Sequence, residues 1–251
     1  MKQFFFLQLI MLPFLAHLQI NQVDAKGRKQ GVWEKKFPNS QVYQYKGQFK
    51  DDKPVGTFIY YYENNKVSAI LKHQPNSNRT DAVYYHDNGK VMSIGHFIAQ
   101  KKDSVWKNYG PSERITSIET FKNGELHGPR IVYYVPQDIN SKVVKIAIES
   151  NYVNGKLDGK YTEYFDIGGV KKMGEYKLNK KIGEWVTNNP NGTKLMLDRY
   201  KDGVPHGWQI AYNSKGVEVG KKYYYYGKNL VGKELETKLK YLKEHGINPN
   251  E

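Results

Sequence analysis

The aromatic residues of this chain recur in three columns with a period of about 24 residues. One column lies seven residues before a marker position, and the other two lie two and five residues after it. Successive markers are 23 to 25 residues apart, with one longer step of 31. The markers are Gly31, Gly56, Arg79, Ser104, Gly128, Gly159, Gly183, Gly207 and Gly232. A repeat of this length is one small supersecondary unit used many times, and it is stable only when stacked on its neighbours.

Two sets of turn signals fall between the aromatic columns. The set before the marker comprises Asn123-Gly124, Asn154-Gly155, Asp202-Gly203 and the weaker Asp51-Asp52 and Asn179-Lys180. The set in the middle of the repeat comprises Asn64-Asn65, Asn88-Gly89, Gly168-Gly169, Asn191-Gly192 and Lys215-Gly216. Asn-Gly and Asp-Gly favour two-residue hairpin turns, because both central positions need positive φ. The chain is therefore predicted to be all-β, an elongated single-layer antiparallel β-meander of about eight 24-residue hairpin repeats.

The marker glycines have two structural interpretations. Each either supplies an unusual φ or lets a neighbouring ring lie flat on bare backbone. Repeats three and four depart from the pattern, because Arg79 and Ser104 replace glycine and no clear Asn-Gly turn precedes them. We expect the sheet to bend or distort there. The longer fifth repeat is expected to contain a polar insertion over residues 136–142.

The best-formed repeats carry a family resemblance. Residues 152–169 read Tyr-Val-Asn-Gly-Lys-Leu-Asp-Gly-Lys-Tyr-Thr-Glu-Tyr-Phe-Asp-Ile-Gly-Gly, and residues 200–208 share the turn, the glycine and the aromatic residue. This unit resembles the MORN-repeat variant of bacterial proteins commonly labelled YwqK-type antitoxins, and the resemblance covers about residues 26–232. It implies an elongated sheet of stacked hairpins and a role in recognising other molecules, sometimes a toxin.

The first 25 residues follow a different pattern. A positive start at Lys2 precedes an apolar run from Phe4 to Leu18, and Val23-Asp24-Ala25 ends the segment. This is typical of a secretory signal peptide, and we expect cleavage near Ala25. The protein is then periplasmic, at the cell surface or extracellular. A retained anchor is the alternative, although the run of about 15 residues is shorter than the roughly 20 that span a bilayer.

The last residues, 233–251, lose the repeat and gain helical spacing. Leu235, Leu239 and Leu242 fall on one face of a helix, and Gly246 is a stop signal. Repeat arrays need atypical ends, so we expect a capping helix and tail. A frayed tail is the alternative.

Catalytic chemistry is predicted to be absent. The chain has no cysteine, and its histidines lack the spacing of a zinc site. An active site also needs a concave pocket, which a single-layer sheet provides poorly. We therefore expect no enzyme activity, no catalytic residue, no cofactor and no metal. His127 and His206 both stand directly before a marker glycine, which indicates a role in turns.

The charge and the rings indicate a binding role. The net charge is +14, and removing residues 1–25 subtracts Lys2 and Asp24 and leaves it at +14. Scattered lysine often only solvates a surface, but it also suits acidic lipid headgroups, acidic polysaccharide or an acidic protein. Export disfavours nucleic acid as the partner.

We expect an exported protein-interaction or scaffold module. The alternatives are an antitoxin-like immunity protein that neutralises a cognate toxin, and a basic surface that binds anionic envelope lipids or polysaccharide. The candidate interaction face is the last aromatic column, expected to be exposed: Tyr61, Tyr84, Tyr109, Tyr133, Tyr164 and Tyr212.

Overall fold

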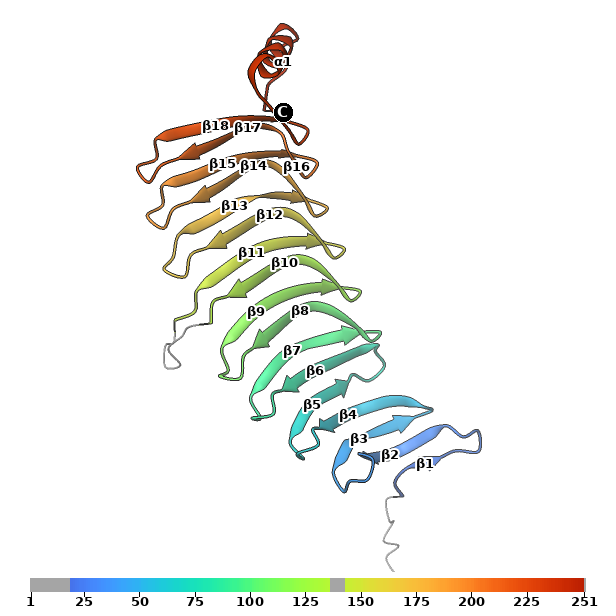
Figure 1. Ribbon diagram of the computed structural model, residues 1–251. Helices are drawn as coiled ribbons and strands as arrows, with labels where there is room; N and C mark the ends of the chain where they lie inside the picture. The colour runs from blue at the N-terminus through green and yellow to red at the C-terminus, as the bar shows by residue number, and fades with distance from the viewer. Residues whose placement is uncertain (1–18, 136–142, 251) are drawn as a thin grey trace, which may run out of the picture.

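The computed structural model describes residues 19–135 and 143–250, and shows one open antiparallel sheet of 19 strands followed by a helix. Consecutive strands pair along the chain, and the two short segments Val204–Pro205 and Gly207–Tyr212 both pair with the strand before them, so the sheet is a continuous meander (Figure 1). The predicted fold class is confirmed. Most of the predicted signal segment and the predicted insertion over 136–142 lie outside the described residues.

The strands follow the repeat at two per hairpin. In the first half they are β1 Gln22–Val23, β2 Lys29–Lys36, β3 Tyr43–Lys50, β4 Lys53–Tyr61, β5 Val67–His73, β6 Arg79–Tyr85, β7 Val91–Ile98, β8 Lys101–Tyr109 and β9 Ile115–Lys122. In the second half they are β10 Glu125–Tyr133, β11 Ile146–Val153, β12 Lys156–Tyr164, β13 Val170–Lys177, β14 Lys180–Asn188, β15 Lys194–Lys201, β16 Val204–Pro205, β17 Gly207–Tyr212, β18 Glu218–Tyr225 and β19 Lys228–Leu230. Helix α1 spans Gly232–Glu244.

The two long edges of the sheet differ in their connections. We call one the tight-turn edge, because seven of its connections are two-residue turns at 51–52, 99–100, 123–124, 154–155, 178–179, 202–203 and 226–227. Both residues of each turn have positive φ, the type I′ geometry that matches the twist of flanking strands. The predicted turn at Asn179-Lys180 lies one residue earlier, at Leu178-Asn179. The opposite, wide-loop edge carries the mid-repeat turns, with Asn65, Gly89 and Gly192 at positive φ.

The marker glycines supply unusual backbone geometry. Gly56, Gly128 and Gly183 have φ of +64°, +106° and +61°, at points where the strand register shifts by a β-bulge. Ser104 keeps this geometry at φ +54°, so repeat four does not depart from the pattern. Repeat three does depart, because β5 and β6 pair without a register shift and are joined by the longer loop 74–78.

Side chains alternate between two faces along every strand. The register places one central row on what we call the ring face: Trp33, Gly47, Phe58, Leu71, Ala82, Gly95, Trp106, Glu119, Arg130, Ser150, Tyr161, Gly174, Trp185, Asp198, Gln209 and Lys222. Three of the four large side chains that are almost fully buried, Phe58, Trp106 and Trp185, are 1–2% exposed and belong to this row. The fourth, Tyr223, lies on the opposite face, in the cluster with α1. Before this cluster, the core is therefore a stack of rings on one face of a single layer.

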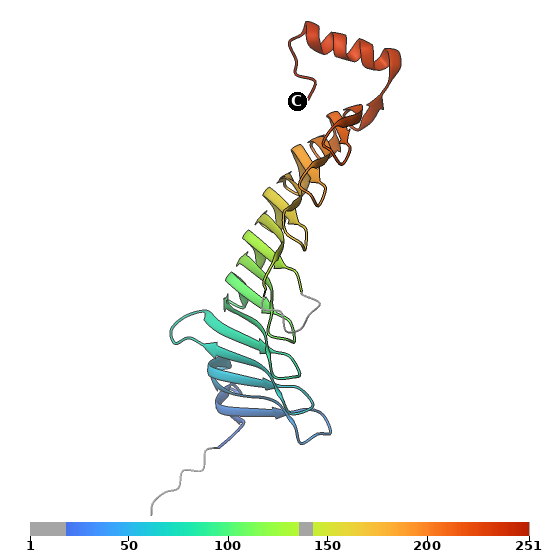
Figure 2. The same cartoon turned by 90° about the vertical axis from the view of Figure 1, so that its left-hand side faces the viewer.

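The opposite face carries an aliphatic central row, and we call it the aliphatic face. Its row consists of Glu34, Lys46, Ile59, Ile70, Val83, Ile94, Lys107, Ile118, Ile131, Glu149, Thr162, Met173, Val186, Leu197, Ile210 and Lys221. Six of these sixteen residues are polar or charged, so the row consists of aliphatic stretches separated by polar positions. The sheet twists along its length, so that the N-terminal strands are seen broadside in Figure 2 and the C-terminal strands are seen closer to end-on.

Both ends of the sheet are covered by residues outside the repeats. At the C-terminal end, Leu242 of α1 is 4% exposed and packs with Tyr223 and Leu230. At the N-terminal end, β1 pairs with β2, and the Asp24 carboxylate accepts a 2.8 Å hydrogen bond from Arg28 Nε. Cleavage after Ala25 would remove β1 and Asp24 and leave β2 as the edge strand.

Candidate functional site

The predicted tyrosine column lies along the wide-loop edge, where each of its members except Tyr84 follows a one-residue register shift. Tyr61, Tyr109, Tyr133, Tyr164 and Tyr212 share this position, and every one is partly buried rather than exposed. Tyr84 does not belong to the column. Its ring lies on the ring face, 6.3 Å from that of Trp106, and Tyr85 occupies the equivalent position instead.

One tyrosine of this column, Tyr164, and one residue beside it, Tyr62, donate hydrogen bonds to other strands. The Tyr164 hydroxyl donates to Glu149 at 2.6 Å, and hydrogen bonding to this carboxylate raises the pKa of Tyr164. The neighbouring Tyr62 donates to the carbonyl of Tyr85 at 2.6 Å. These tyrosines therefore hold the edge together, and most of their ring surface is not free for a partner.

The aliphatic face offers a more accessible apolar surface. Ile94 and Met173 of its central row are 40% and 44% exposed, and Val105 beside the row is 46% exposed. Among the described residues, no second layer of strands or helices covers the sheet before α1 (Figure 2). An apolar row of this length on a single layer is typical of an interaction surface.

The chain itself shows what docks on this face. At the C-terminal end, Leu242 of α1 forms a buried cluster with Tyr223 and Leu230 of the sheet, and Leu235, Leu239 and Trp208 pack against this cluster. The tail then returns to the sheet, where Asn250 Oδ1 accepts from the Trp208 N–H at 3.1 Å. An amphipathic helix with three leucines is therefore a ligand that the aliphatic face accommodates.

On the ring face, three glycines lie directly against the buried aromatic rings. A Cβ atom on Gly47, Gly95 or Gly174 would lie 2.2–2.4 Å from Phe58, Trp106 or Trp185, respectively. Each ring therefore occupies the space of the missing side chain on the preceding strand. This is the second role proposed for marker glycines, but a different set of glycines performs it. These glycines can be recognised in the sequence, because each lies nine residues before a marker position.

The last repeat breaks the stack. Its tryptophan follows the marker directly, as Gly207-Trp208, whereas Trp185 lies two residues after Gly183. Because neighbouring residues point to opposite faces, Trp208 lies on the aliphatic face under α1, with its ring 5.2 Å from Tyr223. Gln209 takes the ring-face position that Trp106 and Trp185 fill in earlier repeats.

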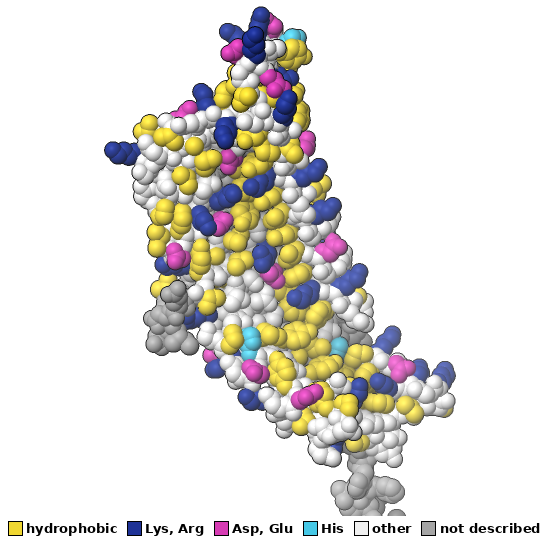
Figure 3. Space-filling view, in the orientation of Figure 1, with side chains coloured by type: hydrophobic (Ala, Val, Ile, Leu, Met, Phe, Trp, Pro, Cys, Tyr) yellow, Lys and Arg dark blue, Asp and Glu magenta, His cyan; other side chains and the backbone are white. Residues whose placement is uncertain are grey.

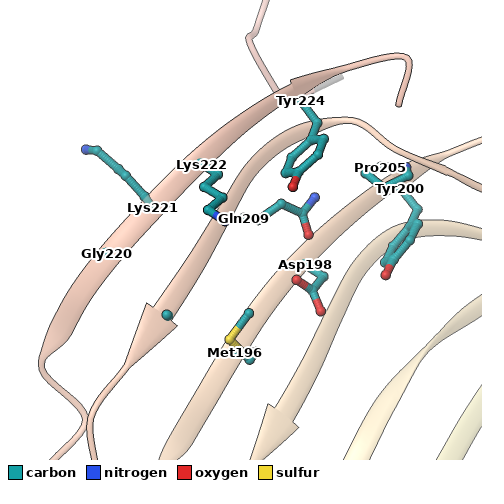
Figure 4. Close-up of a pocket in the computed structure, with 10 residues that line it drawn as sticks. Met196, Asp198, Tyr200, Pro205, Gln209, Gly220, Lys221, Lys222 and Tyr224 are labelled. Atoms are coloured by element: carbon teal, nitrogen blue, oxygen red, sulfur yellow. The ribbon is translucent and has the colours of Figure 1, made fainter. Parts of the chain in front are cut away.

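A half-open hollow of about 530 Å³ results on the ring face. Tyr200 and Tyr224 stand on one side of it, with Asp198, Gln209 and Met196 between them and the wide-loop edge (Figure 4). The Gln209 amide donates to the carbonyl of Arg199 at 2.7 Å, which fixes its orientation. The hollow thus combines two aromatic walls with a carboxylate and an amide.

Charges beside the hollow are partly desolvated. Burial raises the pKa of Asp198, while Lys172 and Lys181 act in the opposite direction. Burial, together with the nearby Lys172, lowers the pKa of Lys181. The Lys181 ammonium lies 4.5 Å from the ring centre of Trp185 and 4.8 Å from that of Tyr200. Lys29 and Lys102 make the same contact with Trp33 and Trp106.

The two histidines before markers bond to the following tight turn. His206 is 3% exposed, and its Nδ1 accepts from the Tyr226 N–H at 3.2 Å. His127 Nδ1 accepts from the Asn154 N–H at 3.4 Å. Within residues 19–135 and 143–250, no group of three or more His, Asp or Glu side chains could hold a metal ion. No helix in the described part of the chain is long and apolar enough to cross a membrane.

Comparisons with known proteins give little. No family model matches the chain, and no curated protein matches it. Among solved structures, it is similar to a crystal structure of a mutant of S. aureus TarM in complex with fondaparinux, alpha-GlcNAc-glycerol and UDP. The identity is 13%, the match covers 62% of this chain and 22% of that chain, and the TM-score is 0.20. A score this low carries no argument about fold or function.

Proposed function

We propose that this chain is an exported, non-enzymatic repeat protein that acts as a protein-interaction module. It presents its aliphatic face to an amphipathic helix of a partner protein. The observation that carries the proposal is the docking of α1 on that face through Leu235, Leu239 and Leu242, while Ile94 and Met173 of the same face stay exposed. Burying such side chains is worth about 25 cal/mol per Å² of apolar surface, so the aliphatic stretches of this row support association.

Site-directed crosslinking tests this proposal. A photoreactive phenylalanine analogue is placed at Ile94, at Met173 or at Ile167, an exposed isoleucine in a wide-edge loop. In envelope extract of the native host, we expect one shared adduct from Ile94 and Met173 and none from Ile167. Its loss when the other position is changed, Met173→Ser with the probe at Ile94 and Ile94→Ser with the probe at Met173, assigns it to the face. Equal labelling from Ile167, or no discrete adduct, would contradict the proposal.

Export is the part of this proposal that rests on residues 1–25. N-terminal sequencing of protein from the host envelope is expected to show a processed chain that begins near Ala25. Retention of Met1 in a cytosolic fraction would contradict export while leaving the interaction module intact.

The resemblance of residues 152–169 to the MORN-repeat variant supports a second candidate, in which the partner is a toxin and this chain an immunity protein. Coexpression with a toxin encoded next to its gene tests the idea. Protection that disappears in the Ile94→Ser, Met173→Ser variant supports it, and unprotected growth arrest contradicts it.

A further inference from the structure

Lysines gather along the tight-turn edge from β7 to β19. Every hairpin end there carries at least one exposed lysine: Lys101, Lys122, Lys156, Lys177, Lys180, Lys201 and Lys228. The six four-residue turn segments that contain them hold only two acids, Glu125 and Asp202, so their net charge is 7 − 2 = +5. In Figure 3, Lys and Arg side chains recur along the right-hand side, where these turns lie in Figure 1.

The wide-loop edge has no such excess. Its six five-residue loops, 62–66, 86–90, 110–114, 165–169, 189–193 and 213–217, are all described. They contain four basic residues, Lys66, Lys90, Arg114 and Lys215, and four acidic ones, Glu63, Asp87, Glu113 and Asp166. Their net charge is 4 − 4 = 0. Five of the 14 net positive charges therefore lie in these turns, whereas the five-residue loops of the wide-loop edge contribute none.

The spacing of these lysines is fixed by the backbone. Each tight turn donates a hydrogen bond to the preceding hairpin, as from Gly124 N to the Lys102 carbonyl and from Gly155 N to the Leu126 carbonyl, both at 2.8 Å. Successive turns are two strands apart, or about 9.5 Å. Lys101, Lys122, Lys156, Lys180 and Lys201 form no salt bridge with any other described residue.

The spacing of the lysines and the twist of the sheet favour one class of polyanion over others. Double-stranded DNA carries a phosphate about every 3.4 Å along each strand, so about two of every three phosphates on the facing strand would meet no lysine. A flat bilayer cannot follow an edge that turns with the twist of the sheet (Figure 2). A flexible chain with sparser acidic groups satisfies both constraints. The hollow opens behind the same edge, and its walls Tyr200 and Tyr224 lie within two residues of tight turns.

We propose that the tight-turn edge between β7 and β19 binds a linear acidic polysaccharide. Carboxylates along the polymer meet the lysine row, and one sugar ring enters the hollow between Tyr200, Tyr224, Asp198 and Gln209. Aromatic walls suit the apolar face of a sugar, and the carboxylate and the amide suit its hydroxyls. This site is separate from the aliphatic face of the proposed function.

Alginate, a polyuronate, is the probe. The edge variant changes Lys101, Lys122, Lys156 and Lys180 to Gln, which keeps the first carbons of each side chain. The control changes Lys66, Lys107, Lys160 and Lys215 to Gln, four exposed lysines away from this edge that lose the same charge. We expect the edge variant to bind about 10- to 100-fold more weakly and the control to bind within about threefold of wild type. Wild-type binding is expected to weaken as salt increases.

Gln209→Trp tests the hollow, because it restores the ring that Trp106 and Trp185 supply in earlier repeats. Weaker alginate binding with an unchanged salt dependence supports the sugar site. Unchanged binding overturns the assignment of the hollow.

Equal losses in the edge variant and the control would overturn the edge assignment. So would edge-dependent binding of phosphatidylglycerol vesicles or oligo-dT in the absence of alginate binding. The Ile94→Ser, Met173→Ser variant must retain alginate binding, which separates this site from the aliphatic face.

Discussion

The indole of Trp106 lies flat against the bare backbone of Gly95 on the neighbouring strand. A Cβ atom on Gly95 would lie 2.2 Å from this ring. The indole Nε1 donates to the carbonyl of His96, the residue after the glycine, at 3.1 Å. Gly174 and Trp185 repeat the arrangement, with a 3.2 Å hydrogen bond to the Glu175 carbonyl. The ring thus gains apolar burial and satisfies its only polar atom at once.

Gly95→Ala should therefore destabilise the protein by about 3 kcal/mol, because neither the rigid ring nor the backbone can move away cheaply. Urea unfolding followed by tryptophan fluorescence measures this. Gly220→Ala is the matched control, since nothing lies within 4 Å of its Cβ position and its φ is not positive. A similar loss at both positions would contradict the role of ring contact.

The turn at Ala99-Gln100 is strained by its residue types. Both have positive φ, at +47° and +65°, where L-residues other than Asn, Asp and Gly are disfavoured. Ala99→Asn with Gln100→Gly should raise the free energy of unfolding by about 1 kcal/mol. Gly124→Ala at the equivalent turn should lower it by a similar amount. Thermal unfolding that moves both variants in one direction would contradict this account.

Two carboxylates should give opposite pH effects. Hydrogen bonds from Arg28 lower the pKa of Asp24 to about 2, so its stabilisation is present above pH 3.8 and is lost as the pH falls toward 2. Burial raises the pKa of Asp198, so its stabilisation is present below pH 3.8 and is lost as the pH rises through its folded pKa.

At pH 7, Asp24→Asn should therefore be less stable than wild type and Asp198→Asn more stable. The stability difference between wild type and Asp24→Asn should vanish near pH 2. That between wild type and Asp198→Asn should vanish below pH 3.8. Denaturant unfolding of the full chain across pH 2–7 checks both. Shifts of the same sign at pH 7 would show that one of the two environments is misassigned.

Helix α1 should stabilise the end of the array. Leu242→Ala removes a side chain that is 4% exposed against Tyr223 and Leu230, and should destabilise the C-terminal repeats by about 2–5 kcal/mol. The exposed Thr237→Ala serves as the control. Deletion of residues 233–251 should lower the melting temperature or cause oligomers, because it uncovers the end of the sheet. An unchanged melting temperature and a monomeric profile would exclude a capping role.

The predicted turns and the terminal helix show how far local signals reach. Asn-Gly and Asp-Gly pairs at 123–124, 154–155 and 202–203 form the expected turns, since φ preference belongs to the residue itself. The failures arise from strand pairing. Ala99-Gln100 and Ser104 adopt positive φ without the expected residue types, because flanking strands already paired on both sides impose that geometry.

The interaction residues were harder to predict. In the third repeat, counting five residues from the marker Arg79 predicts Tyr84 as the column member, whereas Tyr85 is its structural equivalent. The straight pairing of β5 with β6 explains this error, because that hairpin lacks the bulge on which the spacing of the other repeats depends. The column is predicted to be exposed, but its tyrosines are partly buried in the structure.

The amino-acid sequence by itself determined the period, the number of strands per repeat and the place of most turns, because these follow from near-neighbour conformational preferences. Only the tertiary structure decided which face each ring occupies and which glycine it covers. Side chains alternate with period two and every bulge alters the register, so a one-residue difference, as between Trp185 and Trp208, moves a ring to the opposite face. That difference leaves the hollow at Gln209, and the register places the lysines along one edge.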